Sequence, residues 1–326
     1  MPLMPAVVVN GIADVEIKEV PVPKPEKGKV LVKMAMASIC GTDLHYVFHG
    51  WPKNSYPLEP GEPGHEGIGR VIDGGETEFQ EGELVLTVPN IWQARNFAGY
   101  QLIYPHFLVR LPEGPNPSHL LMAQQLGTVI FAARKLPSVE GKTVVVLGQG
   151  SAGLFHDFWL RRAGASRIIV VEPNDDRRSA SLALDVDDAV QVTGSDAVDA
   201  VAELIGANGA DIVVDAVGGV ETLNQSVAML RPEGHLHLFG LPTTHDLVGF
   251  DLGAFFLKRL DMGTIFGAQD EPGLVSFKQA LDLIVNEEID MSPYVTHTLP
   301  IEQAMDAFNL ARYPRDGALK VSISME

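Results

Sequence analysis

Two segments near the start of the chain combine residue types that bind metal ions and move protons. The segment SICGTDLH at residues 38–45 carries a thiol, a hydroxyl, a carboxyl and an imidazole, and GHEG follows at residues 64–67. Thiolate and imidazole are good zinc ligands, and a catalytic zinc site has three protein ligands and one open position. A lone cysteine is more often a buried apolar residue, so Cys40 and His65 indicate a metal site only together.

A glycine-rich loop in the middle of the chain has the pattern of a dinucleotide-binding turn. It reads GQGSAG, and it follows an apolar run and opens a stretch with helical spacing. Gly148 allows a tight turn, Gly150 lets the backbone approach a pyrophosphate, and Gly153 lets the helix pack against the strand. The helix N-terminus, with Ser151 and Ala152, offers unpaired N–H groups to the phosphates.

An acidic residue follows this loop at the distance that such a site requires. Glu172 ends the next predicted strand, 19 residues after Gly153, where a carboxylate binds the adenosine ribose. We expect NAD rather than NADP, because Glu172 repels a 2′-phosphate. Arg177 is either surface charge or a group packed against the adenine. Val217, at the end of a later predicted strand, is a further expected cofactor contact.

Residues 1 to about 110 have short segments of mixed polarity separated by Gly and Pro. This pattern predicts a small all-β barrel. The expected strands are residues 15–20, 29–34, 69–72, 83–88 and 106–110.

The middle of the chain alternates apolar strands with helical stretches, which predicts a doubly wound α/β domain around a parallel sheet. The expected strands are residues 143–148, 167–172, 189–192, 211–217 and 234–239, with a helix at 221–230. Two helices, 273–289 and 301–311, and a strand, 318–323, should close the chain. The simplest layout is a catalytic domain formed by residues 1–120 and 268–326, with a dinucleotide-binding domain at 121–267 inserted in it.

Composition excludes several other classes of protein. The 326 residues carry 42 acidic and 24 basic side chains, a net charge of −18, so neither nucleic acid nor an anionic membrane is an expected partner. The single cysteine rules out an internal disulfide framework and a four-cysteine zinc module. No apolar run is long enough to cross a bilayer. We therefore expect a soluble, cytoplasmic protein.

The segments CGTDLHYVFHG at residues 40–50 and PGHEGIG at residues 63–69 resemble the zinc-dependent medium-chain dehydrogenases of the alcohol dehydrogenase superfamily. They are most similar to the sorbitol and polyol dehydrogenase branch, whose pattern reads Cys-Gly-Ser/Thr-Asp-x-His-Tyr. The resemblance covers nearly the whole chain. It implies a GroES-like β-barrel catalytic domain, a Rossmann domain and a homodimer or homotetramer. The structural zinc lobe of longer members is missing, because residues 89–99 are short and contain no cysteine.

The resemblance also implies a set of zinc ligands. Cys40 and His65 would bind one catalytic Zn²⁺ per chain, with Glu66 as a ligand or a close neighbour of the ligands. Gln124 falls at the third ligand position, where relatives usually have Glu or Cys, so either ligation or a packing role is open for it. A neutral amide ligand leaves more of the zinc ion's positive charge uncompensated than a carboxylate or thiolate would. We therefore hypothesise that Glu66 exchanges with water or substrate during turnover.

Residues of this chain that match functional positions of the family imply a proton path and a nicotinamide site. Thr42 would receive the alcohol proton, and His45 would pass it to solvent. Thr128 falls where relatives contact the nicotinamide, and Asp43 would orient a ligand or cap a helix. Lys320 is either a pyrophosphate contact, as in some relatives, or a surface lysine.

The leading hypothesis is an enzyme that transfers a hydride between NAD(H) and a polyol, a sugar or a small secondary alcohol or ketone. The alternatives are a zinc-free quinone or enoyl reductase and a non-catalytic NAD(H)-binding protein. His235 and His237, on one face of a predicted strand, are either a metal pair or, by preference, sheet-face residues. Asp175, Asp176 and the pair at 187–188 are interpreted as solvated acids.

Overall fold

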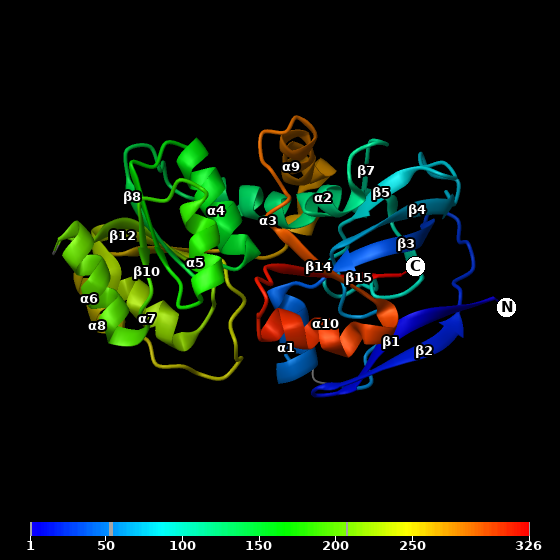
Figure 1. The fold of residues 1–326 in the computed structure, drawn as a ribbon, viewed down its shortest axis with the longest axis horizontal. Coiled ribbons are helices and arrows are strands. Elements are labelled where there is room, and N and C mark those ends of the chain that lie inside the picture. Colours follow the sequence, from blue (N-terminus) through cyan, green and yellow to red (C-terminus); the bar gives the residue numbers. More distant parts are fainter. Residues whose placement is uncertain (1, 52–54, 207, 326) are drawn as a thin grey trace. The chain divides into compact units, whose positions relative to one another are not determined.

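The structure, a computed structural model, describes residues 2–51, 55–206 and 208–325. The chain forms two compact units: residues 1–128 together with 267–326, and residues 129–266. The division falls inside helix α3 (Ala123–Ala133) (Figure 1). Among the described helices, none combines the length and the apolar character that a membrane span needs.

The second unit is built on a six-stranded parallel sheet with the order β10-β9-β8-β11-β12-β13. The strands are β8 (Thr143–Leu147), β9 (Arg167–Val171), β10 (Asp188–Val190), β11 (Ala210–Asp215), β12 (Leu230–Leu238) and β13 (Asp261–Thr264). The helices are α4 (Ser151–Arg162), α5 (Asp175–Leu182), α6 (Gly194–Ile205), α7 (Val220–Met229) and α8 (Leu252–Leu257). Strand β13 was not anticipated, since its sequence DMGT lacks the apolar run of the central strands.

Both faces of this sheet are covered, as the predicted doubly wound fold requires. One face packs its alternate strand residues against α6, α7 and α8, and the other packs against α4. Valine-rich runs such as those of β8 and β9 suit this position, because a parallel sheet between two helical layers buries successive side chains. The predicted α/β class and doubly wound sheet are thereby confirmed.

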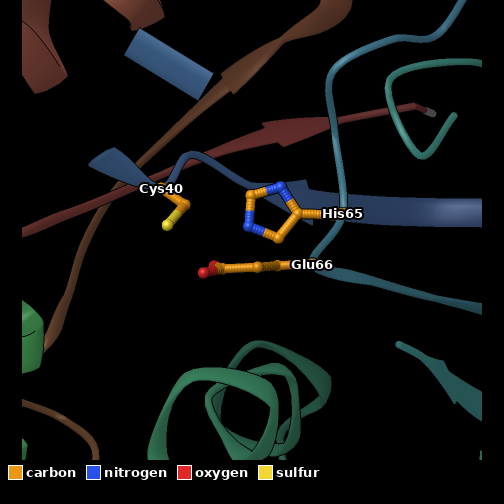
Figure 2. Close-up of side chains that lie close together, drawn as sticks. All are labelled: Cys40, His65 and Glu66. Carbon is orange, nitrogen blue, oxygen red and sulfur yellow. The ribbon is translucent and has the colours of Figure 1, made fainter. Parts of the chain in front are cut away.

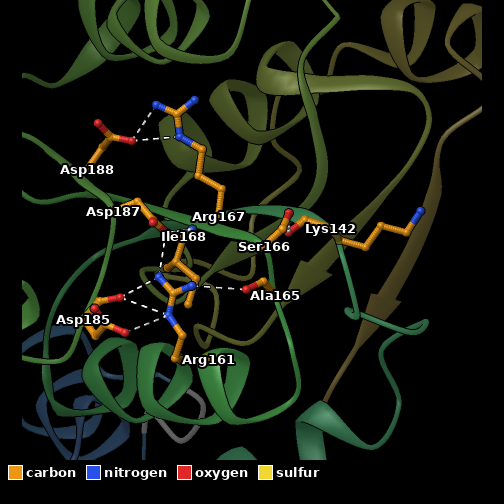
Figure 3. A network of polar contacts seen from close by, with 9 residues as sticks. All are labelled: Lys142, Arg161, Ala165, Ser166, Arg167, Ile168, Asp185, Asp187 and Asp188. Carbon is orange, nitrogen blue, oxygen red and sulfur yellow. Dashed lines mark hydrogen bonds and ion pairs between the residues drawn. The ribbon is translucent and has the colours of Figure 1, made fainter.

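Arginines join α4 and β9 to the acidic loop before β10 (Figure 3). Arg161 lies 2.6 Å from the Asp187 carboxylate, and Arg167 lies 2.7 Å from that of Asp188. Asp187 also accepts a hydrogen bond from the backbone N–H of Ile168. The interpretation of this acidic pair as merely solvated is therefore wrong: each carboxylate neutralises an arginine and holds the ends of neighbouring strands.

The first unit contains a two-stranded sheet, β1-β2, and a seven-stranded sheet with the order β14-β15-β3-β4-β5-β7, in which β6 also pairs with β3. The strands are β1 (Leu3–Gly11), β2 (Asp14–Pro21), β3 (Val30–Ser38), β4 (Gly67–Asp73), β5 (Leu84–Thr87), β6 (Tyr100–Ile103), β7 (Leu108–Arg110), β14 (Val295–Pro300) and β15 (Lys320–Ser324). Strand β3 therefore pairs with β15, from the far end of the chain, which brings the C-terminal segment beside the segments predicted to bind a metal.

The first unit also contains several helices. They are α1 (Gly41–His49), α2 (Pro117–Leu121), α3, α9 (Val275–Val285) and α10 (Ala304–Arg312), with 3₁₀ turns at Pro105–Phe107, Ala268–Asp270, Pro272–Leu274 and Ile301–Gln303. Two predictions need correction. The strand expected at 106–110 starts only at Leu108, because Pro105 initiates a turn, and the helix expected at 273–289 is shorter at both ends.

Candidate active site

Three side chains with metal-binding atoms converge in the first unit (Figure 2). The Cys40 thiol, the His65 imidazole and the Glu66 carboxyl place their ligand atoms within 4.8 Å of one another. Cys40 lies between β3 and α1, and His65 and Glu66 immediately precede β4. Because β3 and β4 are antiparallel neighbours, their pairing brings the two motifs together.

Asp43 holds both halves of this cluster. One carboxylate oxygen lies 3.0 Å from His65 Nδ1, and the other accepts a 2.8 Å hydrogen bond from the Cys40 backbone N–H at the start of α1. An imidazole anchored through Nδ1 presents Nε2 to a metal, which is the usual arrangement of metal-binding histidines. The two alternatives for Asp43, a helix cap and a residue that orients His65, are therefore compatible in one side chain.

Glu66 forms a buried ion pair. Its Oε2 lies 2.7 Å from Lys320 Nζ and accepts a hydrogen bond from Ser38, and Lys320 also donates to Gln125 Oε1 at 3.2 Å. Glu66 and Lys320 are 1% exposed. The surface alternative given for Lys320 is wrong, because the side chain is buried and neutralises Glu66, while the pyrophosphate contact stays a prediction.

These contacts shift the pKa values of both charged members of the cluster. Burial opposes the charge on His65, but the Asp43 carboxylate outweighs it and holds the pKa of His65 well above its ordinary value. Burial likewise opposes ionisation of Glu66, and the charges of Lys320 and His65 lower its pKa below the usual range. Glu66 is therefore an ionised carboxylate even though it is buried.

Gln124 and Thr128 lie one turn apart on α3. The Gln124 side-chain nitrogen is 3.5 Å from the His65 carbonyl oxygen, so the amide lies beside the cluster and is almost fully buried. Thr128 donates its hydroxyl to the Gln124 carbonyl oxygen at 3.1 Å. Direct ligation by Gln124 stays a prediction, as does the nicotinamide contact of Thr128.

The two residues predicted to move protons lie on α1. Thr42 Oγ1 is 3.9 Å from Cys40 Sγ, so this hydroxyl adjoins the cluster. His45 is one turn further on, and its Nδ1 is buried with no hydrogen-bond partner in the described structure. Burial, with a smaller effect of the neighbouring His49, lowers the pKa of His45 to about 4. His45 is thus neutral at physiological pH, and its low pKa makes it a weaker proton acceptor than an ordinary imidazole.

Five of the nine predicted cofactor-binding residues border a cavity of about 370 Å³ in the second unit, and Ser151, Ala152, Gly153 and Thr128 are not among its lining residues. Its walls include Gly148, Gly150, Glu172, Arg177 and Val217. The sequence analysis missed further lining residues, namely Pro173, Thr193, Ala216, Glu221, Thr222 and Gln225. Pro173, Thr193 and Ala216 follow the ends of parallel strands, where open α/β sheets bind their ligands, and the other three lie on α7.

The three glycines differ in their geometry. Gly148 has a φ of 86°, which only glycine adopts easily, and it makes the tight turn after β8. A Cβ on Gly153 would overlap the Gly148 carbonyl oxygen, so helix and turn approach too closely for any side chain. Beside Gly150 there is open space.

Two buried carboxyl groups shape the rim of this cavity. Glu172 accepts hydrogen bonds from the backbone N–H groups of Gln149 at 2.7 Å and Asn174 at 2.8 Å, so it fastens the glycine loop. Asp215 accepts from the N–H of Val217 at 2.9 Å and from Thr222. The sequence contained a signal for Asp215, because it is an acidic residue at the end of an otherwise apolar run.

Comparisons with known families agree with this geometry. Residues 26–101 match the alcohol dehydrogenase GroES-like domain, and residues 153–286 match the zinc-binding dehydrogenase family. The chain belongs to the zinc-type medium-chain dehydrogenase/reductase family. Membership confirms the predicted enzyme class, an NAD(P)-linked alcohol dehydrogenase-type oxidoreductase that uses zinc and acts on small molecules.

Individual relatives of this medium-chain dehydrogenase are distant but cover its full length. The chain is 27% identical to the L-threonine 3-dehydrogenase of Bacillus velezensis, over 95% of this chain and 96% of the relative. The 2R,3R-butanediol dehydrogenase of Bacillus subtilis has the same fold, with a TM-score of 0.83 and 21% identity over 98% and 99% of the two chains. A zinc-binding dehydrogenase homologue from Sinorhizobium meliloti, solved with NADP, also scores 0.83 at 21% identity, over 99% and 100%.

Proposed function

We propose that this chain is a zinc-dependent dehydrogenase that transfers a hydride between NAD(H) and a polyol, a sugar or a small secondary alcohol or ketone. The observation that carries the proposal is the convergence of the Cys40 thiol, the His65 imidazole and the Glu66 carboxyl. Binding of a cofactor alone needs no such cluster and no adjoining proton acceptors.

The donor set fits zinc. Thiolate, imidazole and carboxylate are its usual ligands, and the Nδ1 of His65 is anchored by Asp43. We infer that Cys40 and His65 hold the ion, with Gln124 or Glu66 as the third ligand. A zinc ion bound there supplies a Lewis acid that lowers the pKa of an alcohol.

The chain's own residues then handle the proton. Thr42 adjoins Cys40 and is the proposed first acceptor, and His45 is the proposed route to solvent, where its low pKa of about 4 means that it holds the proton only transiently. Glu66 is paired with Lys320, and we infer that it alternates between this lysine and the metal position. Unchanged metal retention and turnover in Glu66→Gln would contradict that exchange.

The cavity of the second unit is the proposed site of the nicotinamide dinucleotide, which supplies the hydride acceptor. Its phosphates would meet the N–H groups of residues 150–153 at the start of α4, and Glu172 would meet the adenosine ribose. Glu172 supports NAD over NADP because its charge repels a 2′-phosphate. Arg177 also lines this cavity and is partly buried, which supports its packing against the adenine.

We further infer that the protein acts in the cytoplasm as a homodimer or homotetramer. The support is β13, which ends the parallel sheet and has exposed apolar residues beside it, among them Phe256, Leu257, Met262 and Phe266. The net charge of −18 argues against nucleic acid or anionic membrane as partners.

The deciding experiment measures zinc per chain and NAD reduction against a panel of alcohols, before and after chelation. About one zinc at the Cys40 site, with turnover lost on chelation and in Cys40→Ala, supports the proposal. Turnover that survives metal removal would instead indicate a zinc-free quinone or enoyl reductase. NADH binding without any turnover would indicate a non-catalytic binding protein. Glu76→Gln, an exposed substitution outside the cluster, is the control.

A further inference from the structure

A second group of imidazoles lies in the interior of the second unit, away from the residues used above. His235 and His237 extend from one face of β12, and their ring centres are 6.1 Å apart. His156, from α4, has its ring centre 6.4 Å from that of His237. All three side chains are at least nine-tenths buried.

Two of these rings are fixed by hydrogen bonds through Nδ1. His156 Nδ1 lies 2.8 Å from the Ala152 carbonyl oxygen, and His235 Nδ1 lies 2.9 Å from the Asp261 carboxylate. Both oxygens are acceptors, so each Nδ1 carries the proton and each Nε2 has a free lone pair. Histidines that bind metals are commonly oriented in this way by a carbonyl or a carboxylate.

The remaining ring nitrogens have nothing to bind within the part of the chain that the structure describes. His156 Nε2, His235 Nε2 and both nitrogens of His237 are buried without a hydrogen-bond partner. A buried polar atom left unsatisfied costs about 1–3 kcal/mol, and such atoms in native proteins usually indicate water or an ion. Four in one cluster therefore require an occupant.

The neighbouring strand leaves room for that occupant. Gly263 of β13 pairs with His237, and a Cβ placed on this glycine would lie 3.4 Å from His235 Nε2 and 3.8 Å from His237 Nδ1. Both nitrogens therefore face the same side of Gly263, where there is no side chain.

We propose that His235 Nε2 and His237 Nδ1 bind a divalent transition-metal ion of the Ni²⁺, Cu²⁺ and Zn²⁺ class, beside Gly263. In this arrangement His237 carries its proton on Nε2, which leaves the lone pair of Nδ1 free for the ion. The ion then gives His235 Nε2 and His237 Nδ1 a partner, while the Nε2 atoms of His156 and His237 keep none among the described residues. Imidazole nitrogens are suitable ligands for these three metals.

Charges around the proposed ion are consistent with it. Asp261 is exposed on β13 and neutralises part of the cation's charge through His235, while Lys135, the basic group whose charge acts on His237, is exposed and lies over the Phe131 ring. The site supplies two protein ligands, fewer than the Cys40 cluster, so it should bind metal more weakly. It is independent of the dehydrogenase chemistry proposed above.

The test uses the full-length protein, stripped of metal and titrated with Cu²⁺ and Zn²⁺. We expect two ions per chain, of which one survives Cys40→Ala and is lost in His237→Gln. Cu²⁺ in the Cys40→Ala protein should give an EPR spectrum with coupling to two imidazole nitrogens. Asp261→Asn, an exposed substitution that should leave the fold intact, should weaken the second ion roughly tenfold.

The control is His245→Gln, which removes an exposed histidine on the same unit and should leave both ions in place. A protein that binds no ion beyond the one lost in Cys40→Ala would overturn the proposal, since water would then satisfy these nitrogens. A second ion that persists with unchanged affinity in both His237→Gln and Asp261→Asn would overturn it as well.

Discussion

At the scale of single residues, the proposed metal ligands depend on neighbouring side chains for their orientation and charge. Asp43 joins His65 to the backbone of Cys40, and Lys320 neutralises Glu66. The ligand types were visible in the sequence, but Lys320 was not, because lysine is rarely buried and its partner is 254 positions away in the chain. Only the pairing of β15 with β3 brings the two residues together.

Replacing Asp43 should weaken metal binding. Asp43→Asn removes the charged acceptor that orients His65, and loss of such a partner typically costs 10–100-fold in metal affinity, as an order of magnitude. Competition with a chelator measures the dissociation constant for zinc directly. Asp14→Asn, on the exposed face of β2, is the matched control. Equal affinities in the two variants would show that Asp43 only caps α1.

Replacing Lys320 should destabilise the fold. Lys320→Met leaves the Glu66 carboxylate buried without its cation, which typically costs about 3–5 kcal/mol in the free energy of unfolding. Urea denaturation checks this value. Adding Glu66→Gln to the same protein should restore part of the loss, because the stranded charge is then gone. Lys27→Met breaks only an exposed pair and should change little.

At the scale of elements, strands buried on both faces were predicted best. The runs of β8, β9 and β11 are apolar and bounded by turn residues, so their sequences suffice. Helix α1 was missed because its residues include β-branched and aromatic types, and it begins at a cysteine rather than a usual cap. Its start depends on Asp43, whose second partner, His65, comes from another element.

Helix α4 carries a buried acid that should make its stability depend on pH. Asp157 is fully buried, and among the described residues neither of its oxygens has a hydrogen bond of normal geometry; burial raises its pKa well above the ordinary value and outweighs the opposing effect of the Gln149 amide. The folded protein therefore holds this proton more tightly than the unfolded chain does. The resulting stabilisation is complete below about pH 4 and is lost as the pH rises through the folded-state pKa.

Asp157→Asn should accordingly raise the free energy of unfolding at pH 8 by more than about 1 kcal/mol, since each pKa unit corresponds to roughly 1.4 kcal/mol. The measurement is urea denaturation between pH 5 and pH 9, where the variant should show the flatter profile. Asp282→Asn, on the exposed side of α9, serves as the control. A parallel profile in Asp157→Asn would mean that the carboxyl is ionised in the native protein.

At the scale of the whole molecule, the alternation of strands and helices in the sequence was enough to predict the fold class. The edge strand β13 could not be predicted in this way. Strand β13 is short and contains Gly263, so it has little strand signal of its own. An edge strand next to exposed apolar side chains favours association.

A charged substitution on this edge strand should lower the molecular mass of the assembly in solution. Met262 is 43% exposed on β13, and Met262→Lys places a charge where a second copy would pack. Size-exclusion chromatography with light scattering should then report a smaller assembly than for the wild type. Val275→Lys charges a comparably exposed apolar site on α9 and should leave the mass unchanged. A wild-type protein that is already monomeric would refute the proposed oligomer.

Glu172 has a structural role as well as its proposed role in ribose binding, and this limits how the coenzyme preference of the protein can be redesigned. Its carboxylate accepts hydrogen bonds from the backbone of Gln149 and Asn174, so it stabilises the loop in addition to its proposed contact with the ribose. Replacing it to admit a phosphorylated coenzyme would also release two amide groups at the turn. Engineers should therefore first introduce a substitute acceptor for those amides, and judge success by binding of both coenzymes rather than by a switched ratio alone.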